Sequence, residues 1–206
     1  MSILDRLASA LGRNDERPNV ELAEELAAKP DAAAVVELVG ALSGPTAVSN
    51  DAIKVLYELG ALRPELVAPH VGAFLALLGS KNNRNVWGAL QAIEAVTQLV
   101  PETVVVSLPA IVSAADKGSV IAKDKAVQIL AKLAAAGHAE AALPVLLERV
   151  ENAAPNQFPM YAEAASLVVD AAHRERLARI LEARLARIEA SAKRVRVEKS
   201  LRRLRS

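Results

Sequence analysis

Apolar side chains recur every three to four residues along most of this chain, and Gly or Pro usually separates one apolar segment from the next. Four of these segments read alike: residues 51–59, 89–99, 124–133 and 161–169. The spacing is typical of amphipathic helices, because it places Ala, Leu, Val and Ile on one face. The segments Val104-Val105-Val106 and Val195-Arg196-Val197 are β-like only locally, because each is flanked by helical sequence. The pattern therefore predicts an all-α chain.

The four similar segments form an internal repeat. Their aligned apolar residues are Leu59, Leu99, Leu133 and Val169, which gives steps of 40, 34 and 36 residues. A proline follows each of the first three by 10 or 11 residues, at Pro69, Pro109 and Pro144. Because proline removes a helical hydrogen bond, each second helix should kink or begin there. Two helices in a period of this length predict a right-handed α-solenoid of about five helical pairs.

Gly and Pro positions divide the repeat into units, because these residues favour helix boundaries. The predicted helical pairs are residues 18–44, 45–80, 81–118, 119–154 and 155–188. We expect the turn between the two helices of a pair near Pro64, Pro101 and Gly137.

The two ends of the chain differ from the repeats. Residues 1–17 should form an N-terminal cap helix over 2–12, which Gly12 can end, and a charged linker. The apolar face of that helix would carry Ile3, Leu4, Leu7, Ala8 and Leu11. Residues 189–206 should form a basic C-terminal helix or tail. We therefore predict a single repeat domain over residues 1–206.

Composition restricts the core and the cellular setting. Hydrophobic residues make up 52% of the chain but aromatic residues only 2%, so Ala, Leu, Val and Ile must fill the core at short distances between helices. The chain has no Cys, which excludes disulfides and thiolate metal sites and fits a reducing compartment. We see no signal peptide and no apolar run of ~20 residues, so a cytoplasmic location without a membrane span is expected.

Charge is distributed unevenly along the chain. Residues 173–206 contain 12 Lys and Arg against 4 Glu, whereas the rest of the chain contains 13 basic and 20 acidic residues. Seven of the basic residues cluster near the end: Lys193, Arg194, Arg196, Lys199, Arg202, Arg203 and Arg205. These seven are the candidate binding residues of the chain.

The apolar stripe of the C-terminal segment changes register. Its first part comprises Leu177, Leu181, Leu185, Ile188, Ala192 and Val195, and its second part comprises Val197, Leu201 and Leu204. We therefore expect a bent or two-part helix whose second part docks less firmly. Three roles are open for it: a cap on the last repeat, a contact with an acidic protein surface, or binding to phosphates of nucleic acid or an anionic membrane.

Residue spacing points to no catalytic, cofactor or metal site. His70, His138 and His173 have no neighbour at a metal-ligand spacing. The nine glycines are scattered and form no phosphate loop, and carboxylate pairs such as Glu24 and Glu25 lie on charged helical faces. We predict that the chain is not an enzyme and has no small-molecule substrate.

Two polar or aromatic features have a structural and a binding interpretation. Trp87 can fill the core or a helix junction, or it can stack on an extruded base, although such sites need several stacking groups. The polar loop 81–85 can cap the next helix through its Asn side chains, or it can contact a ligand. In both cases we favour the structural interpretation.

Several segments resemble the HEAT family of helical repeats. The resemblance is carried by residues 85–89 leading into Ile93, residues 122–126 leading into Ile129, and the second-helix starts at 107–109 and 142–144. Ala126 with Lys123 or Lys125, and Ala89 with Arg84, could fill the family's alanine and basic positions. The resemblance covers roughly residues 18–188. The strict Asp-Val-Arg form is absent, which leaves an armadillo-like or otherwise divergent array open.

The resemblance implies a function in binding rather than in catalysis. HEAT-like proteins mostly bind other proteins along a curved surface, and the groove lined by the second helices would serve here. We therefore expect a non-catalytic protein-binding scaffold or adaptor with a protein partner. The alternative is a nucleic-acid-associated protein that binds phosphates through the basic C-terminal helix, and such binding would weaken steeply with salt.

Overall fold

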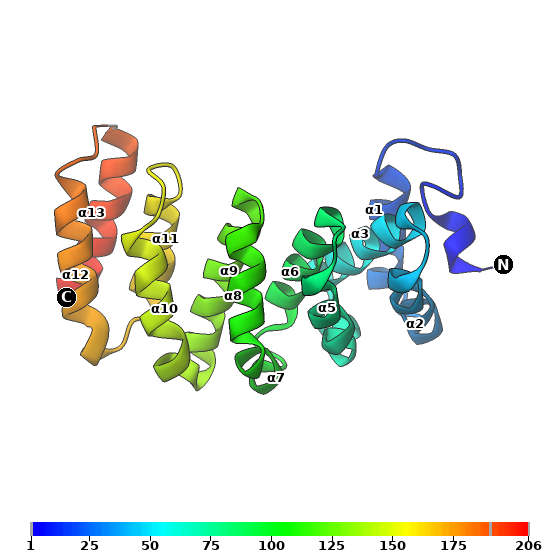
Figure 1. Cartoon of the computed structure of the whole chain (residues 1–206), viewed down its shortest axis with the longest axis horizontal. Coiled ribbons are helices and arrows are strands. Elements are labelled where there is room, and N and C mark those ends of the chain that lie inside the picture. Colours follow the sequence, from blue (N-terminus) through cyan, green and yellow to red (C-terminus); the bar gives the residue numbers. More distant parts are fainter. Residues whose placement is uncertain (1, 190, 206) are drawn as a thin grey trace. The chain divides into compact units, whose positions relative to one another are not determined.

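A computed structural model describes residues 2–189 and 191–205, and the regular structure of these residues is helical throughout (Figure 1). The α-helices are α1 (Arg17–Ala28), α2 (Ala32–Gly40), α3 (Thr46–Leu62), α4 (Pro64–Val67), α5 (Val71–Ala76), α6 (Asn83–Val96), α7 (Pro101–Val106), α8 (Leu108–Lys117), α9 (Val120–Leu133), α10 (Ala139–Glu151), α11 (Phe158–Val168), α12 (Ala171–Leu185) and α13 (Ser191–Arg205). Short 3-10 turns are η1 (Ile3–Arg6), η2 (Ala41–Ser43), η3 (Ala68–His70) and η4 (Leu77–Gly79), and a π-turn is η5 (Ala134–His138). The all-α prediction is confirmed.

Helix boundaries fall where proline and glycine predict them. Pro64 and Pro101 are the first residues of α4 and α7, where a missing N–H costs no helical hydrogen bond. Gly137 joins α9 to α10 with a positive φ of 99°, a conformation that glycine adopts without strain. Each predicted pair therefore contains a first helix and a second helix: α1 and α2, α3 and α4–α5, α6 and α7–α8, α9 and α10, and α11 and α12.

The chain folds into two compact units, unit 1 (Met1–Lys125) and unit 2 (Ala126–Ser206), and the boundary lies inside α9. In unit 1, α3 packs against α1 on one side and against α6 on the other. Figure 1 shows the second helices α2, α5 and α7 on one side of this row of first helices. In unit 2, α11 packs against α10 and α13, and α13 also packs against α12. The prediction of a single domain over 1–206 stays a prediction.

Burial corrects the predicted repeat steps. Leu59 is fully buried in α3, whereas its predicted counterpart Leu99 is 52% exposed, because α6 already ends at Val96. The buried counterpart of Leu59 is Val96, 37 residues later, and Leu133 follows after another 37. The same step relates three buried alanines of successive first helices, Ala52, Ala89 and Ala126. The first two steps are therefore 37 residues each, and the predicted 40 and 34 are wrong.

The second helices break near two of the three prolines. Pro69 lies in η3, which separates α4 from α5, and α8 begins directly before Pro109 after a break at Ser107. In the next pair, α10 begins at Ala139 and continues through Pro144. The predicted break is therefore confirmed at Pro69 and Pro109, but α10 does not begin at Pro144.

The predicted N-terminal helix over 2–12 is wrong. Only the 3-10 turn η1 forms, and Leu7 after it has extended backbone (φ −67°, ψ 149°). Side chains supply the reason: Asn19 Oδ1 accepts the Ala8 N–H at 3.0 Å, and Asp51 Oδ2 accepts the Ser9 N–H at 2.7 Å. These side-chain oxygens take the place of the backbone carbonyls that would accept in a helix, so the segment leaves the helical path and packs against α1 and α3. Leu7 and Ala8 are buried there, and Leu11 is exposed.

One segment, Val120–Glu151, has the length and apolar composition of a membrane-spanning helix. Gly137 interrupts it, so that α9 and α10 are 14 and 13 residues long. Each is shorter than the ~20 residues that a spanning helix needs. Length and composition alone are therefore weak grounds for a span here.

The C-terminal segment forms two helices, as predicted, but the first ends at Leu185, well before the change of register that follows Val195. α12 ends at Leu185, and α13 packs against α11 and α12. Val197, Leu201 and Leu204 are buried in this contact, whereas Val195 of the first stripe is exposed. The prediction of a loosely docked second part is therefore wrong, because its own stripe supplies a complete apolar face.

Glycine at one helix contact gives a direct test of the packing. A Cβ on Gly88 of α6 would lie 2.8 Å from Cγ1 and 3.3 Å from Cγ2 of Ile53 on α3. We expect Gly88→Ala to lower the free energy of unfolding by about 1–3 kcal/mol through overpacking. Chemical denaturation of the full chain measures this change.

Gly72 of α5 is the matched control, because a Cβ there meets nothing within 4 Å. Gly72→Ala should leave stability unchanged or raise it by up to about 1 kcal/mol, as alanine in a helix normally does. Equal destabilisation by both substitutions would contradict close packing of α3 and α6.

Candidate functional site

Buried polar side chains connect the first helices of unit 1. Asn19 Nδ2 of α1 donates to Asp51 Oδ1 of α3 at 2.8 Å, and Asn85 Nδ2 of α6 donates to Ser49 Oγ of α3 at 2.6 Å. Asn19, Ser49, Asp51 and Asn85 are all buried. Hydrogen bonds between buried groups offset the cost of removing them from water, so these residues fix how α1, α3 and α6 face one another.

The polar segment 81–85 caps the following helix, which is the structural role predicted from the sequence. Asn82 caps α6 by accepting the Arg84 N–H at 3.1 Å, and its Nδ2 donates to Asn50 Oδ1 at 2.7 Å. Asn85 is buried in the first turn of α6, and its Oδ1 has no hydrogen-bond partner within the described part of the chain. These asparagines serve the contact between α3 and α6.

Charged and aromatic side chains cover one edge of the same helices. Lys54 Nζ lies 2.6 Å from Glu58 and 3.1 Å from Glu16, and 4.9 Å from the centroid of the Tyr57 ring. Arg84 also pairs with Glu16. Burial alone would lower the pKa of Lys54, but hydrogen bonds to Glu58, Tyr57 and Glu16 outweigh it and raise the pKa above its ordinary value. The charges in this cluster are therefore balanced internally.

Trp87 lies at a helix junction. It is half-buried on α6, and its ring centroid lies 5.6 Å from that of Tyr57 on α3, with the ring planes at 51°. Tilted aromatic pairs at this distance stabilise the contact between the two helices. The interpretation of Trp87 as a junction residue is confirmed.

The structure places the seven candidate basic residues on α13, most of them exposed. Four of them form hydrogen bonds or ion pairs inside unit 2: Lys193 with Asn156, Arg194 with Glu198, Arg196 with Glu163, and Arg205 with Glu182. Lys199 and Arg202 are exposed, and neither forms a hydrogen bond or ion pair among residues 2–189 and 191–205. The helix therefore directs part of its charge toward its own unit.

The pair between Arg196 and Glu163 is the best formed of these contacts. Arg196 Nε and Nη2 donate to the two carboxylate oxygens of Glu163 at 2.7 and 2.6 Å. This bidentate hydrogen bond lowers the pKa of Glu163 below its ordinary value, and the charge of nearby Lys199 lowers the pKa further. It joins α13 to α11 through charge as well as through apolar packing.

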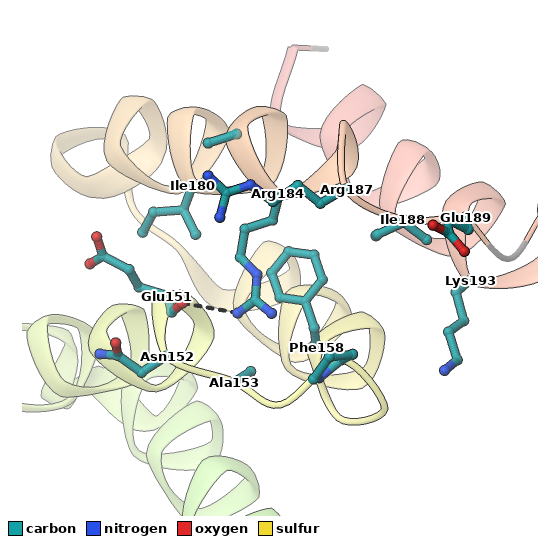
Figure 2. A pocket seen from close by; sticks show the side chains of 12 residues that line it. Glu151, Asn152, Ala153, Phe158, Ile180, Arg184, Arg187, Ile188, Glu189 and Lys193 are labelled. Carbon is teal, nitrogen blue, oxygen red and sulfur yellow. Dashed lines mark hydrogen bonds between the residues drawn. The ribbon is translucent and has the colours of Figure 1, made fainter.

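A cavity of about 800 Å³ in unit 2 was not foreseen from the sequence (Figure 2). Phe158, Ile180 and Ile188 form apolar parts of its wall, and Arg184, Arg187 and Lys193 bring positive charge to it. Glu151 and Glu189 also line it. Residues from α10, α11, α12 and the start of α13 line the cavity together, so it could not be predicted from any single segment of the sequence.

Arg184 is the most constrained charged side chain of the cavity. Its Nη1 donates to the backbone carbonyls of Val150 at 3.2 Å and Glu151 at 2.9 Å, and its guanidinium carbon lies 4.1 Å from the centroid of the Phe158 ring. Burial lowers the pKa of Arg184, and the charge of Arg187 lowers it further. The contacts with Arg184 are therefore dipolar and aromatic, without a neutralising carboxylate.

His173 contributes to a helix cap. Asp170 caps α12 by accepting the His173 N–H at 2.9 Å, and its carboxylate lies 2.8 Å from His173 Nδ1. The hydrogen bond from His173 lowers the pKa of Asp170. Within the part of the chain that the structure describes, no group of three or more His, Cys, Asp or Glu side chains could hold a metal ion.

No known family model matches this chain, and no curated protein sequence matches it either. Among solved structures, the fold is similar to the crystal structure of an engineered protein, a target of the Northeast Structural Genomics Consortium. The two chains are 17% identical with a TM-score of 0.64, and the match covers 100% of this chain and 97% of the other. At this identity the similarity concerns the helical fold alone.

The Arg196–Glu163 pair predicts a pH dependence. Because its folded-state pKa lies below the ordinary value of 4.5, Glu163 stabilises the fold above that pH, and the contribution is lost as pH falls through the folded-state pKa. Both side chains are more than a third exposed, so solvent screening limits the effect to under about 1 kcal/mol. We expect Glu163→Gln to lower the thermal midpoint slightly at pH 7 and to converge with the wild type as pH falls through the folded-state pKa of Glu163.

The control is Glu175→Gln, because Glu175 lies 3.9 Å from Arg179 and both side chains are largely exposed. Its thermal midpoint should follow the wild type across the pH range. A wild-type advantage over Glu163→Gln that persisted unchanged at acid pH would contradict the ion-pair explanation.

Proposed function

We propose that this chain is a non-catalytic protein-binding scaffold with a HEAT-like architecture, a right-handed α-solenoid of about five helical pairs. The alternation of first and second helices supports the architecture. The 37-residue step between the buried alanines Ala52, Ala89 and Ala126 supports a repeated packing unit. So do the successive contacts of α1 with α3 and of α3 with α6 within unit 1.

The observation that carries the binding proposal is apolar exposure on second helices of unit 1. Val36 on α2 is 57% exposed, and Val106 on α7 is 81% exposed. Single exposed apolar residues are common on protein surfaces. These two lie on the helices that a HEAT-like scaffold uses for its groove, where a partner would remove them from water at a gain of roughly 25 cal/mol per Å².

The mechanism would be rigid presentation of many weak contacts. The buried bonds Asn19–Asp51 and Asn85–Ser49 hold α1, α3 and α6 in one arrangement. The second helices pack on these first helices, α2 on α3 and α5 on α6. A preorganised surface loses less conformational entropy when a partner binds, which raises affinity without additional contacts.

Peptides selected against the immobilised full chain from a displayed library test this proposal. We expect the selected peptides to lose about ten-fold or more in affinity when Val36 and Val106 are both replaced by Asp, because each Asp would place an unpaired charge in an apolar interface. Fluorescence anisotropy with labelled peptides measures the change.

Leu167→Asp is the matched control, because Leu167 is 65% exposed but lies on the first helix α11. The control variant should bind the selected peptides as the wild type does. Failure to enrich any peptide, or equal loss in the control, would contradict binding by the second helices.

The alternative proposal is that the basic helix α13 binds the phosphates of nucleic acid, and charge substitutions on this helix test it. Truncating α13 would expose the contacts around Val197 and Leu201, so charge substitution is the cleaner design. Lys199→Gln with Arg202→Gln removes two exposed charges that form no ion pair among the described residues. If the helix binds phosphates, DNA and RNA affinity should fall in this variant, and the slope of log affinity against log salt should decrease by about 2. The scaffold proposal expects no binding by either protein.

A further inference from the structure

We propose that the cavity beside Arg184 binds an organic anion, a carboxylate carried on an apolar body. The volume of about 800 Å³ lies in the range of small-molecule sites, roughly 300–1,000 Å³. Phe158, Ile180 and Ile188 offer apolar walls, and the cationic side chains give the charge. This proposal does not depend on the scaffold proposal.

Arg184 is held in place to receive an anion. The carbonyls of Val150 and Glu151 both accept from one terminal nitrogen, Nη1. Figure 2 shows the bond to Glu151 and the ring of Phe158 beside the guanidinium. Its Nε and Nη2 form no hydrogen bond within the described part of the chain. Nε–H and Nη2–H point in parallel and match the two oxygens of a carboxylate. The protein therefore holds the guanidinium of Arg184 in place through Nη1 and leaves its Nε–H and Nη2–H available to donate to a carboxylate.

The balance of charge around Arg184 favours an anion. Arg187 and Lys193 also line the cavity, and the two carboxylates on its wall do not pair with Arg184. Glu151 faces Arg176, with 3.5 Å between the nearest side-chain atoms. With Glu151 set against Arg176, the cations Arg184, Arg187 and Lys193 face one further carboxylate, Glu189, so the cavity has a net positive charge that favours an anionic ligand.

An occupied site would remove a cost that the empty site carries. A partly buried cation without a carboxylate partner is unfavourable because it has lost part of its hydration. The lowered pKa of Arg184 reflects that loss. A bound carboxylate would supply the missing counter-charge, and its apolar body would cover the walls formed by Ile180 and Ile188.

The test is calorimetric titration of the full chain with 4-phenylbutyrate and with its neutral amide. We expect saturable one-to-one binding of the acid and binding of the amide that is at least ten-fold weaker. Arg187→Glu should weaken binding of the acid at least ten-fold, because it places a carboxylate at the cavity.

Arg184→Gln should weaken binding as well, but it also removes the bonds to Val150 and Glu151, so its fold is checked by circular dichroism. The control is Arg179→Gln on the same helix, whose partner is Glu175 at 3.9 Å and which does not line the cavity. It should bind as the wild type does. Absence of saturable binding of the acid at millimolar concentration, or full binding by Arg187→Glu, would overturn the proposal.

A second pair of probes separates the two sources of such a carboxylate. The peptide acetyl-Ala-Ala-Leu-Phe is titrated with a free and with an amidated C-terminus. Tighter binding of the free peptide than of 4-phenylbutyrate, lost in Arg187→Glu, supports the site and assigns it to protein C-termini. Binding of 4-phenylbutyrate alone supports the site and assigns it to small organic acids.

Discussion

The close approach of α3 and α6 is the constraint on which unit 1 depends. Gly88 leaves no room for a Cβ beside Ile53, and the neighbouring alanines Ala52 and Ala89 are fully buried. With aromatic residues at only 2% of the chain, the core cannot reach native packing density by filling wide gaps between helices, so the helices must lie close together. The low aromatic content therefore accounts both for the small residues at the contact between α3 and α6 and for the aliphatic residues around it.

Close packing also explains why polar residues occur between the helices. Polar groups trapped in a narrow contact cannot be solvated, so each needs a partner within the protein. Asn19 shows the result: it accepts from the backbone of Ala8 and donates to Asp51, and thereby joins the N-terminal turn, α1 and α3. A buried network of this kind specifies one arrangement among several apolar alternatives, since a shifted helix would leave its amides unpaired.

Helix boundaries could be predicted from the sequence, whereas register and the cavity could not. Pro64, Pro101 and Gly137 act locally, through backbone conformation, and the chain turns at each of them. Register depends on which apolar residue faces the core, and Leu99 fits a helical pattern as well as Val96 does until neighbouring helices are placed. The N-terminal segment has a helical pattern in the sequence but does not form a helix, because its acceptors, Asn19 and Asp51, are brought near only by the tertiary fold.

The basic C-terminal region shows why the pairing of charges matters more than their number. By sequence, residues 173–206 carry a large positive excess that suggests an external acidic partner. In unit 2, Arg196 and Arg205 meet Glu163 and Glu182 of α11 and α12, so part of this excess holds the unit together. Arg184 belongs to the same excess and differs from its neighbours only in its surroundings, two carbonyls and an aromatic ring in place of a carboxylate. A count of charges treats these arginines alike. Arg196 and Arg205 already have a counter-charge, whereas the partly buried Arg184 has none and therefore has reason to bind a ligand.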